Sequence, residues 1–461
     1  MPTFLSTDIL FFLLLLALGA TVFHAARREH LRRPWRKVAR STSAMVSLMI
    51  LLAYLTIAVL DSIRFQPKAE GERQYQSEPI SLLDSWLMPI KSRVEKTYSA
   101  PLSAYAYSRE MVHTPEGVER WEYPRLQYGG GHLADPQRGH MADVLFTATK
   151  GLAIGFSVWL IPISLWLGGL AWQQRSGFVA HLSVLLRGEC EIPWRAVALT
   201  LLLICLIGGM MGTLGLKYHV LGTGKVGEDV FYQSLKSIRT GLLIGTLTTF
   251  ATLPLALTLG ILAGYFRGWV DDLIQYLYTT LNSIPGVLLI AAAMLVMQGY
   301  MSRHEADFAS LALRADFRLL ALCLILGMTS WTGLCRLLRA ETLKLREMEY
   351  VQAAQALGVR RGTILMRHIL PNLFHLVLIS VALDFSSLVL AEAVLSYINI
   401  GVDPSMDSWG NMINGARLEM ARDPVVWWSL AAAFLFMFAL VLPANLFADA
   451  VRDAFDPRRG E

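Results

Sequence analysis

Apolar runs long enough to cross a membrane recur along this chain and are separated by polar segments. A helix needs about 20 predominantly apolar residues to span a bilayer core. The runs that meet this pattern are 9–26, 43–60, 151–172, 196–216, 241–265, 284–301, 319–338, 373–398 and 425–448. Since backbone groups in lipid must be satisfied within the segment, these runs predict an all-α, polytopic membrane protein with about nine transmembrane helices.

The basic residues indicate which polar segments face the cytoplasm. Seven arginines and lysines fall between residues 27 and 40, immediately after the first apolar run. Cytoplasmic loops carry such an excess of positive charge, so we expect 27–40, 174–194 and 340–371 inside the cell. The segments 64–148 and 217–238 are then expected outside, the former as an insert with some structure of its own.

One cytoplasmic segment, 341–372, is polar and basic but has a helical pattern. The residues spaced at i, i+3, i+4 and i+7 on one face of this helix are Tyr350, Ala353, Ala354 and Leu357. Because the centre of that face is small, another protein can approach it closely. Gly358 follows where a C-cap glycine belongs, and a second helical piece, about 363–369, is expected to end before Pro371.

Composition agrees with a membrane protein. Hydrophobic residues make up 54% of the chain, charged residues only 17%, and the mean hydropathy is +0.45. The net charge of +5 comes mostly from arginines in short loops, so it indicates membrane orientation and not nucleic-acid binding. The four cysteines show no CxxC or metal spacing, and no disulfide framework is predicted.

No catalytic, ATP or metal site is expected in this chain. Gly224-Lys225 partly matches a phosphate-binding loop, but Val226 stands where Ser or Thr would bind magnesium, and His219 replaces the leading glycine. The possible metal ligands of the insert are too sparse to predict a metal site: His132, Asp135 and His140.

Two acidic residues, Asp384 and Glu392, interrupt the apolar run 373–398. A charged side chain at the centre of a membrane helix costs roughly 2.5–3.5 kcal/mol on insertion scales, so neither is expected to face lipid. Both are expected to face either a translocation path or an interface with a partner subunit, and the sequence leaves these two alternatives open.

The order Gln352-Ala353-Ala354, Gly358 and Leu370-Pro371 closely resembles the EAA loop of ABC-importer permeases, in particular their dipeptide/oligopeptide/nickel branch. Gln352 replaces the first Glu of that motif, and His368 replaces its Ile. In the family this loop is the coupling helix that docks into a groove of the ATPase subunit. The resemblance thus implies an ATPase-coupling loop containing Tyr350, Gln352, Ala353, Ala354, Leu357, Gly358 and Pro371.

A segment on the expected outer face is also similar to a pattern of this family. The matching residues are His219, Gly222, Thr223, Gly227 and Asp229. Gly224 and Glu228 replace an Asp and an Arg of the family pattern, so the resemblance does not imply an ionic role for these two positions.

The resemblance covers about residues 42–63 and 217–458. The expected division is 1–41 as an extra N-terminal membrane helix and basic cytoplasmic linker, 42–63 as the first permease-family membrane helix, 64–148 as an extracytoplasmic insert, 149–216 as two additional membrane helices, and 217–461 as an ABC permease core containing the loop 341–372.

The resemblance implies a permease subunit of an ATP-driven ABC importer, multi-pass in the inner (plasma) membrane, that forms a path for peptides or a related small solute. The implied partners are a second homologous permease, two ATPase subunits that bind ATP and Mg²⁺, an extracytoplasmic solute-binding protein and membrane lipids, with no nucleic acid. The chain itself is then not an enzyme and holds no cofactor. Nickel and peptide-like antibiotics are alternative solutes. A secondary transporter or a membrane scaffold is favoured less, because no repeated pair of broken helices is seen.

Overall fold

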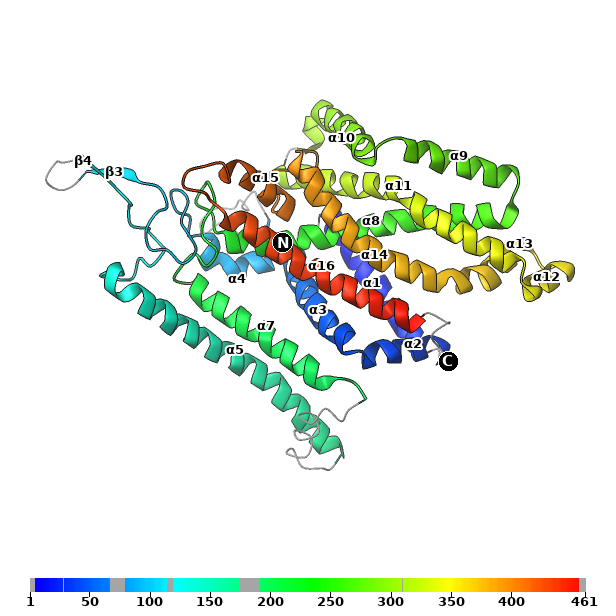
Figure 1. Cartoon of the computed structure of the whole chain (residues 1–461), viewed down its shortest axis with the longest axis horizontal. Helices are drawn as coiled ribbons and strands as arrows, with labels where there is room; N and C mark the ends of the chain where they lie inside the picture. The colour runs from blue at the N-terminus through cyan, green and yellow to red at the C-terminus, as the bar shows by residue number, and fades with distance from the viewer. Residues whose placement is uncertain are drawn as a thin grey trace. The chain divides into compact units, whose positions relative to one another are not determined.

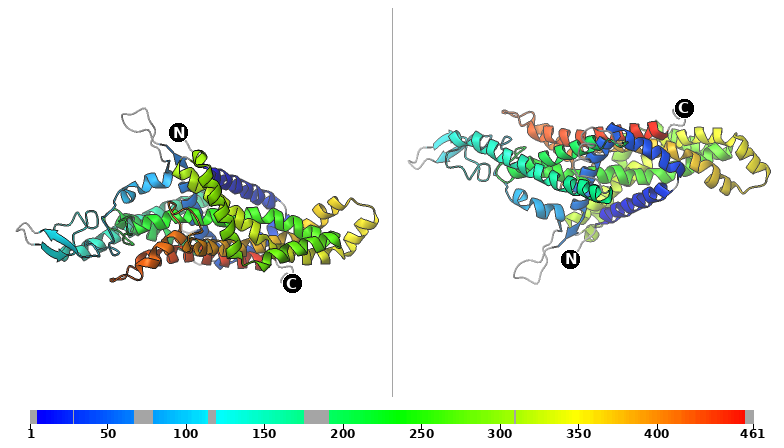
Figure 2. Two further views of the ribbon diagram at one scale, coloured as in Figure 1. Left: turned by 90° about the horizontal axis from the view of Figure 1, so that it is seen from above. Right: turned by 90° about the horizontal axis from the view of Figure 1, so that it is seen from below.

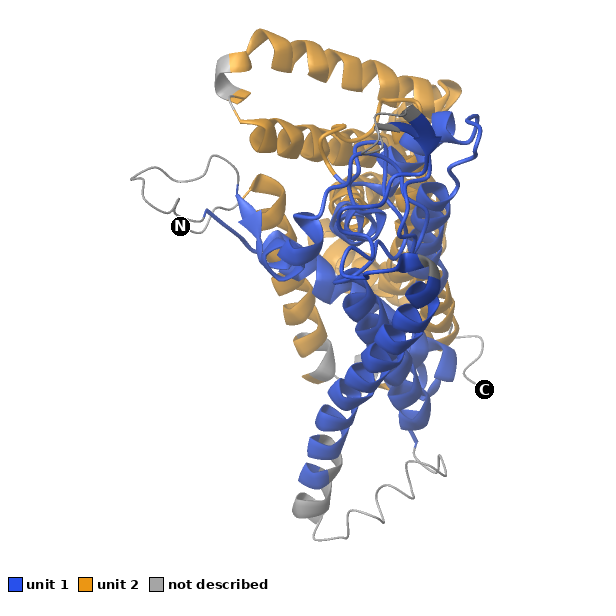
Figure 3. Cartoon of the chain, turned by 90° about the vertical axis from the view of Figure 1, so that its left-hand side faces the viewer, with its two compact units in different colours: residues 1–3, 36–240, 407–443 blue, residues 4–35, 241–406, 444–461 orange. Residues whose placement is uncertain are grey.

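The computed structural model describes residues 5–27, 29–66, 79–113, 119–174, 191–308 and 310–455. The chain divides into two compact units (Figure 3). Unit 1 comprises Met1–Thr3, Arg36–Thr240 and Asp407–Pro443, and unit 2 comprises Phe4–Trp35, Gly241–Met406 and Ala444–Glu461. Most of the predicted cytoplasmic segment 174–194 lies outside the described residues.

Unit 1 contains helices and two short antiparallel hairpins. Its helices are α3 (Thr42–Ser62), α4 (Leu82–Lys91), α5 (Pro136–Gln174), α7 (Trp194–Gly215) and α15 (Trp409–Glu419). The hairpins pair β1 (Arg64–Phe65) with β2 (Ile80–Ser81) and β3 (Glu110–His113) with β4 (Glu119–Glu122). The long helices α5 and α7 run side by side (Figure 1), and α7 also packs on α3.

Unit 2 is built from helices. They are α1 (Ser6–Arg27), α9 (Trp269–Ser283), α10 (Gly286–Arg303), α11 (Leu311–Arg346), α12 (Glu349–Ala356), α13 (Arg361–Ile364) and α14 (Leu370–Tyr397), with a short 3₁₀ turn at Glu305–Phe308. Three helices have residues in both units: α2 (Glu29–Arg40), α8 (Val230–Phe266) and α16 (Trp428–Phe455). Helix α11 packs against α1, α9, α10, α12 and α14, so it is the centre of this unit.

Eight described helices are long and apolar enough to cross a membrane, which confirms the polytopic all-α class. The candidate spans include one for every predicted run except 319–338. That run forms the middle of α11, a continuous helix of 36 residues. Arg318 and Arg339 border the run and Arg336 lies within it, and many of its side chains, including Leu319 and Leu338, are buried within unit 2.

The prediction that a helical piece ends before Pro371 is wrong. After α13 the chain makes a π-helical turn, Leu365–Ile369, and passes directly into α14. Pro371 lies in the first turn of α14, where its missing N–H group breaks no helical hydrogen bond. The N–H of Leu370 donates to the carbonyl of Leu365, the wider i→i−5 pattern of a π turn.

Candidate functional site

Helix α12 and the turn after it form the loop that the sequence singled out. The loop lies at one end of unit 2, where α11 finishes and α14 begins (Figures 1 and 2). Gly358 closes α12 with φ +74°, a left-handed conformation that favours glycine. The N–H of Gly358 donates to the carbonyl of Gln355, and that of Val359 donates to the carbonyl of Ala354. These two bonds make a Schellman cap.

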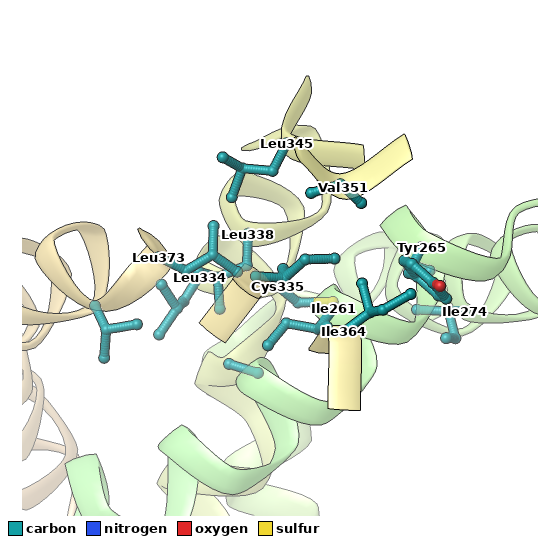
Figure 4. Close-up of a cluster of buried hydrophobic side chains, with 14 of the residues drawn as sticks. Ile261, Tyr265, Ile274, Leu334, Cys335, Leu338, Leu345, Val351, Ile364 and Leu373 are labelled. Carbon is teal, nitrogen blue, oxygen red and sulfur yellow. The ribbon is translucent and has the colours of Figure 1, made fainter. Parts of the chain in front are cut away.

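The two faces of α12 have different surroundings. Val351 is fully buried and Ala354 is 8% exposed, and both belong to a cluster of apolar side chains from α8, α9, α11 and α14 (Figure 4). Gln352 and Ala353 are exposed, Tyr350 is 43% exposed, and Leu357 is 83% exposed. The prediction that Ala354 lies on the free face is therefore wrong. Ala354 packs inward, because an alanine at this point fills the close contact between α12 and the cluster.

Polar contacts hold this loop to neighbouring helices of unit 2. The Arg346 guanidinium donates to the carbonyl of Tyr265 at 2.8 Å, and Arg267 forms an ion pair with Glu347 at 2.6 Å. Nearby, Arg339 makes a bidentate pair with Asp271 at 2.5 and 2.7 Å, which lowers the pKa of that carboxyl. The ends of α8, α9 and α11 are thus tied to the base of the loop.

Tyr350 is hydrogen-bonded to the second half of the loop, beside Pro371. The side chain of Asn372, next to Pro371, donates to the Tyr350 hydroxyl at 3.1 Å and to the His368 carbonyl at 2.6 Å. The beginning of α12 is thereby bonded to the beginning of α14. These contacts hold the loop to the helix ends, and the hydrophobic side chain of Leu357 at the end of α12 is 83% exposed.

The variant Gly358→Val is expected to leave the protein in the membrane but abolish transport, because a β-branched residue resists φ +74° at a cost of roughly 1–3 kcal/mol. Nothing lies within 4 Å of a Cβ built at this position, so the effect comes from the backbone alone. Asn tolerates this conformation, so Gly358→Asn is the matched control and should retain most uptake. Full uptake by the valine variant would refute a conformational role for the cap.

The two acids of α14 lie in different environments. Glu392 is 2% exposed and accepts a hydrogen bond from Ser396, one turn further along the same helix, at 2.7 Å. Asp384 is partly buried and lines a small cavity together with residues of α8 and α11. Glu392 does not line that cavity, so the structure separates two residues that the sequence treated as a pair.

The five residues of the outer segment come together in unit 1 and bind the insert. Buried His219 lies between two carboxylates, with Nδ1 2.8 Å from Asp229 and Nε2 3.5 Å from Glu95 of the insert. Asp229 also accepts hydrogen bonds from the N–H groups of Phe231 and Tyr232, so it caps the start of α8.

Thr223 and the two glycines complete this contact. The Thr223 hydroxyl donates to the carbonyl of Thr97 and accepts from the N–H of Ser99, while the Thr223 carbonyl accepts from the Trp428 indole at 2.9 Å. Gly222 lies against the Ser99 carbonyl and Gly227 against the Glu95 carbonyl. We call the contact of residues 219–229 with residues 95–99 the outer clasp.

The comparisons with known proteins agree with this architecture. Residues 256–461 match the family model of the binding-protein-dependent transport system inner membrane component. The chain is 32% identical over 242 residues to the glutathione transport system permease protein GsiD of Pectobacterium atrosepticum, covering 52% of this chain and 73% of that protein. It is 30% identical over 239 residues to the oligopeptide transport system permease protein OppC of Mycobacterium tuberculosis, covering 52% of this chain and 76% of the relative. This chain belongs to that permease family.

The family places the permease in the inner membrane as a multi-pass component of an ABC importer of the peptide class, working in a complex with other subunits. A further relative, the dipeptide transport system permease protein DppC of Lactococcus lactis, is 29% identical over 244 residues, 53% of this chain and 65% of its own length. The family model begins at residue 256, so the insert and the helices α5 and α7 lie before the matched region.

The sequence missed a second polar cluster of the permease, also in unit 1. Lys236 of α8 lies 3.0 Å from Asp84 of the insert and 3.4 Å from Asp61 at the end of α3. Burial alone would raise the pKa of Asp84, but Lys236, Tyr232 and Lys91 hold it well below its usual range. The spacing Ser81-x-x-Asp84, a capping box at the start of α4, could have indicated the local role of Asp84. It could not have indicated a lysine about 150 residues away.

The outer clasp contains two groups with displaced pKa values. Burial alone would lower the pKa of His219, but Asp229 and Glu95 raise it to about 9. Burial alone would raise the pKa of Glu95, but His219 and the N–H groups of residues 127–129 hold it at about 2. Both pKa shifts favour a charged His219 imidazolium between the carboxylates of Asp229 and Glu95 near neutral pH.

These pKa shifts predict how the clasp responds to pH. The His219 contribution is complete below its ordinary pKa of 6.5 and is lost as the pH rises through about 9. The Glu95 contribution is complete above 4.5 and is lost as the pH falls through about 2. Amide hydrogen exchange of residues 95–103 in nanodiscs should accelerate between pH 7 and 10, after correction for intrinsic rates. The variant His219→Gln should lack this step, and an unchanged step in that variant would contradict the assignment.

Proposed function

We propose that this permease forms the path by which peptides or related small solutes cross the inner membrane, driven by separate ATPase subunits that dock on the loop 341–372. The other partners are a second homologous permease and an extracytoplasmic solute-binding protein. ATP and Mg²⁺ are bound by the ATPases, and this chain performs no hydrolysis of its own. This chain contributes the transport path and the loop 341–372, which passes the motion of the ATPases to the membrane helices.

The proposal rests on the different environments of the two faces of α12. One face is fixed to the ends of four helices through Val351 and Ala354, and the other presents Tyr350, Ala353 and Leu357 to a partner. A short amphipathic helix with a protruding apolar side chain fits a groove on another protein. Arg346 and Arg267 connect the end of α11 to the end of α8 next to the loop. Because these contacts are rigid, a displacement of α12 would move α8 and α11 with it.

The solute assignment rests on the names of the relatives, which are permeases of glutathione, oligopeptide and dipeptide transport systems. All three solute classes carry an amide backbone and charged ends. A path for them needs a polar lining within the membrane, and intramembrane ionisable residues mark such paths. Among the described residues, Asp384 lies at a cavity of unit 2 and meets that requirement.

The proposal is tested in proteoliposomes that contain this permease, its neighbouring permease and both ATPases, with the solute-binding protein added outside. ATP inside the vesicles should drive uptake of radiolabelled trialanine, and vanadate should stop it. Uptake of radiolabelled nickel without trialanine would replace the peptide assignment by the nickel alternative. Uptake that persists without the ATPases but follows an ion gradient would contradict an ABC importer.

A further inference from the structure

A small, partly open cavity lies in unit 2, where α8, α11 and α14 meet. Its volume is about 60 Å³. The lining residues are Thr249, Thr252, Leu253, Ser330, Leu334, Val381, Asp384, Ser387 and Leu388. Four hydroxyl side chains and one carboxylate therefore share a site whose remaining walls are aliphatic.

The cavity lies among the middle turns of its three helices, which in a membrane-spanning helix are near the bilayer centre. Asp384 is the fifteenth residue of the 28 in α14, Thr249 the twentieth of the 37 in α8, and Ser330 the twentieth of the 36 in α11. All three helices thus contribute their middle turns, about 20 to 30 Å from either end at 1.5 Å per residue. Solute sites of transporters lie near this depth, whereas structural polar contacts can be placed at the helix ends at lower cost.

Three of the four hydroxyl groups of the cavity donate their protons to the helix backbone. Thr249 donates to the carbonyl of Gly245, Thr252 to that of Thr248, and Ser387 to that of Asp384, at 2.7 to 2.9 Å. An oxygen that has donated its proton retains only lone pairs. These hydroxyls can therefore act toward a ligand only as hydrogen-bond acceptors, like the carboxylate beside them.

The Asp384 carboxylate has no hydrogen bond or ion pair with any residue in the part of the chain that the structure describes. A charge at this depth is costly unless it is compensated. By contrast, Glu392 on the same helix is bonded to Ser396. A site with an unpaired carboxylate and three hydroxyls that can only accept favours a ligand that is cationic and carries several donors. A primary ammonium group, with three N–H donors, has these properties.

We infer that this cavity receives the primary ammonium group of the transported solute, with Asp384 as its counter-ion and the hydroxyls of Thr249 and Thr252 as further acceptors. The inference rests on the proposed transport function and names the chemical group by which the path recognises its solute. The volume admits a head group and excludes a whole peptide, because a single water needs only about 10–15 Å³. The rest of the solute then lies outside the cavity.

The test compares trialanine with its N-acetylated form, which lacks the ammonium group. Uptake is measured in the reconstituted complex with saturating solute-binding protein preloaded with either peptide. The variant Asp384→Asn should reduce trialanine uptake roughly 10- to 100-fold, the loss of one charge-assisted contact, and leave acetyl-trialanine uptake unchanged. Preferences of the binding protein cancel, because the ratio of the two rates is compared between wild type and variant.

The matched control is Asp272→Asn, the same change at an exposed position outside the cavity, which should leave the ratio unchanged. Equal losses for both peptides in Asp384→Asn would overturn the ammonium assignment, and so would loss of assembly with the second permease.

A second readout needs no transport. With the four natural cysteines replaced by alanine, trialanine should slow labelling of Ser387→Cys by a thiol reagent in the purified complex, and acetyl-trialanine should not. Equal protection by both peptides overturns the inference, whereas absent ATP-driven uptake overturns the proposed function.

Discussion

Replacing Leu357 with aspartate is expected to separate the permease from its ATPases and abolish uptake. Leu357 is 83% exposed at the C-terminal end of α12, and its neighbours on the free face, Ala353 and Tyr350, are exposed as well. A buried apolar anchor of an interface contributes about 2 kcal/mol or more, and a carboxylate in an apolar groove adds a desolvation cost. Association with the ATPases should weaken roughly 30-fold or more, as measured by pull-down from nanodiscs.

The control for this prediction is Leu418→Asp, in α15. Leu418 is 68% exposed and lies in α15 of unit 1, not in the loop 341–372, so the same chemical change there should leave ATPase binding intact. Both variants should reach the membrane in wild-type amounts, because neither side chain supports the core. Normal ATPase binding by Leu357→Asp would show that the free face of α12 is not the docking surface.

The second large effect is expected at Gly227, in the outer clasp. Gly227 has φ +79°, and a Cβ at this position would lie 1.8 Å from the carbonyl oxygen of Glu95. The variant Gly227→Ala must displace the insert or the loop, so we expect the free energy of unfolding to fall by about 3 kcal/mol or more. The measurement is thermal unfolding in detergent, with proteolysis reporting release of the insert.

Gly224→Ala provides the comparison in the same loop. The nearest atom to a Cβ at Gly224 is the carbonyl oxygen of Glu228 at 3.9 Å, an ordinary contact. This variant should therefore unfold within about 1 kcal/mol of wild type. If the two glycine variants proved equally stable, the outer clasp would not depend on the close approach of Gly227 to Glu95.

The apolar runs predicted the helices well because length and hydropathy are properties of one segment. The side of α12 that packs inward was harder to predict. Its i, i+3, i+4 and i+7 pattern includes Ala354, but Val351 lies one turn before Ala354 and defines another stripe with it. Only the cluster formed with α8, α9, α11 and α14 decides between the two stripes.

The continuation of the helix through Pro371 could not be predicted from local rules either. A proline ordinarily ends the preceding helix, but the π turn at Leu365–Ile369 carries the chain into α14 with Pro371 in a position where no N–H is needed.

The polar sites depended on contacts between distant segments. His219 and Asp229 were identified by resemblance, but their partner Glu95 lies in the insert, about 125 residues earlier. The acidic residues in α14 were visible as charges in an apolar run, whereas the difference between Asp384 and Glu392 arises from neighbouring helices and from Ser396. A sequence pattern identifies a charged residue whose burial in a membrane helix costs free energy, but it does not identify the neighbouring groups that offset this cost.

In the assembled importer we expect the tip of α12 to contact an ATPase subunit. The most direct measurement is cross-linking of a single cysteine, Leu357→Cys, in the assembled complex with a short bifunctional thiol reagent, followed by mass spectrometry. We expect Leu357→Cys to form a cross-link to a cysteine placed in the ATPase groove, with a yield that changes when ATP binds, and we expect no cross-link from Leu418→Cys. A complex that retains ATP-driven uptake but gives no cross-link from Leu357→Cys to any ATPase position would contradict this expectation.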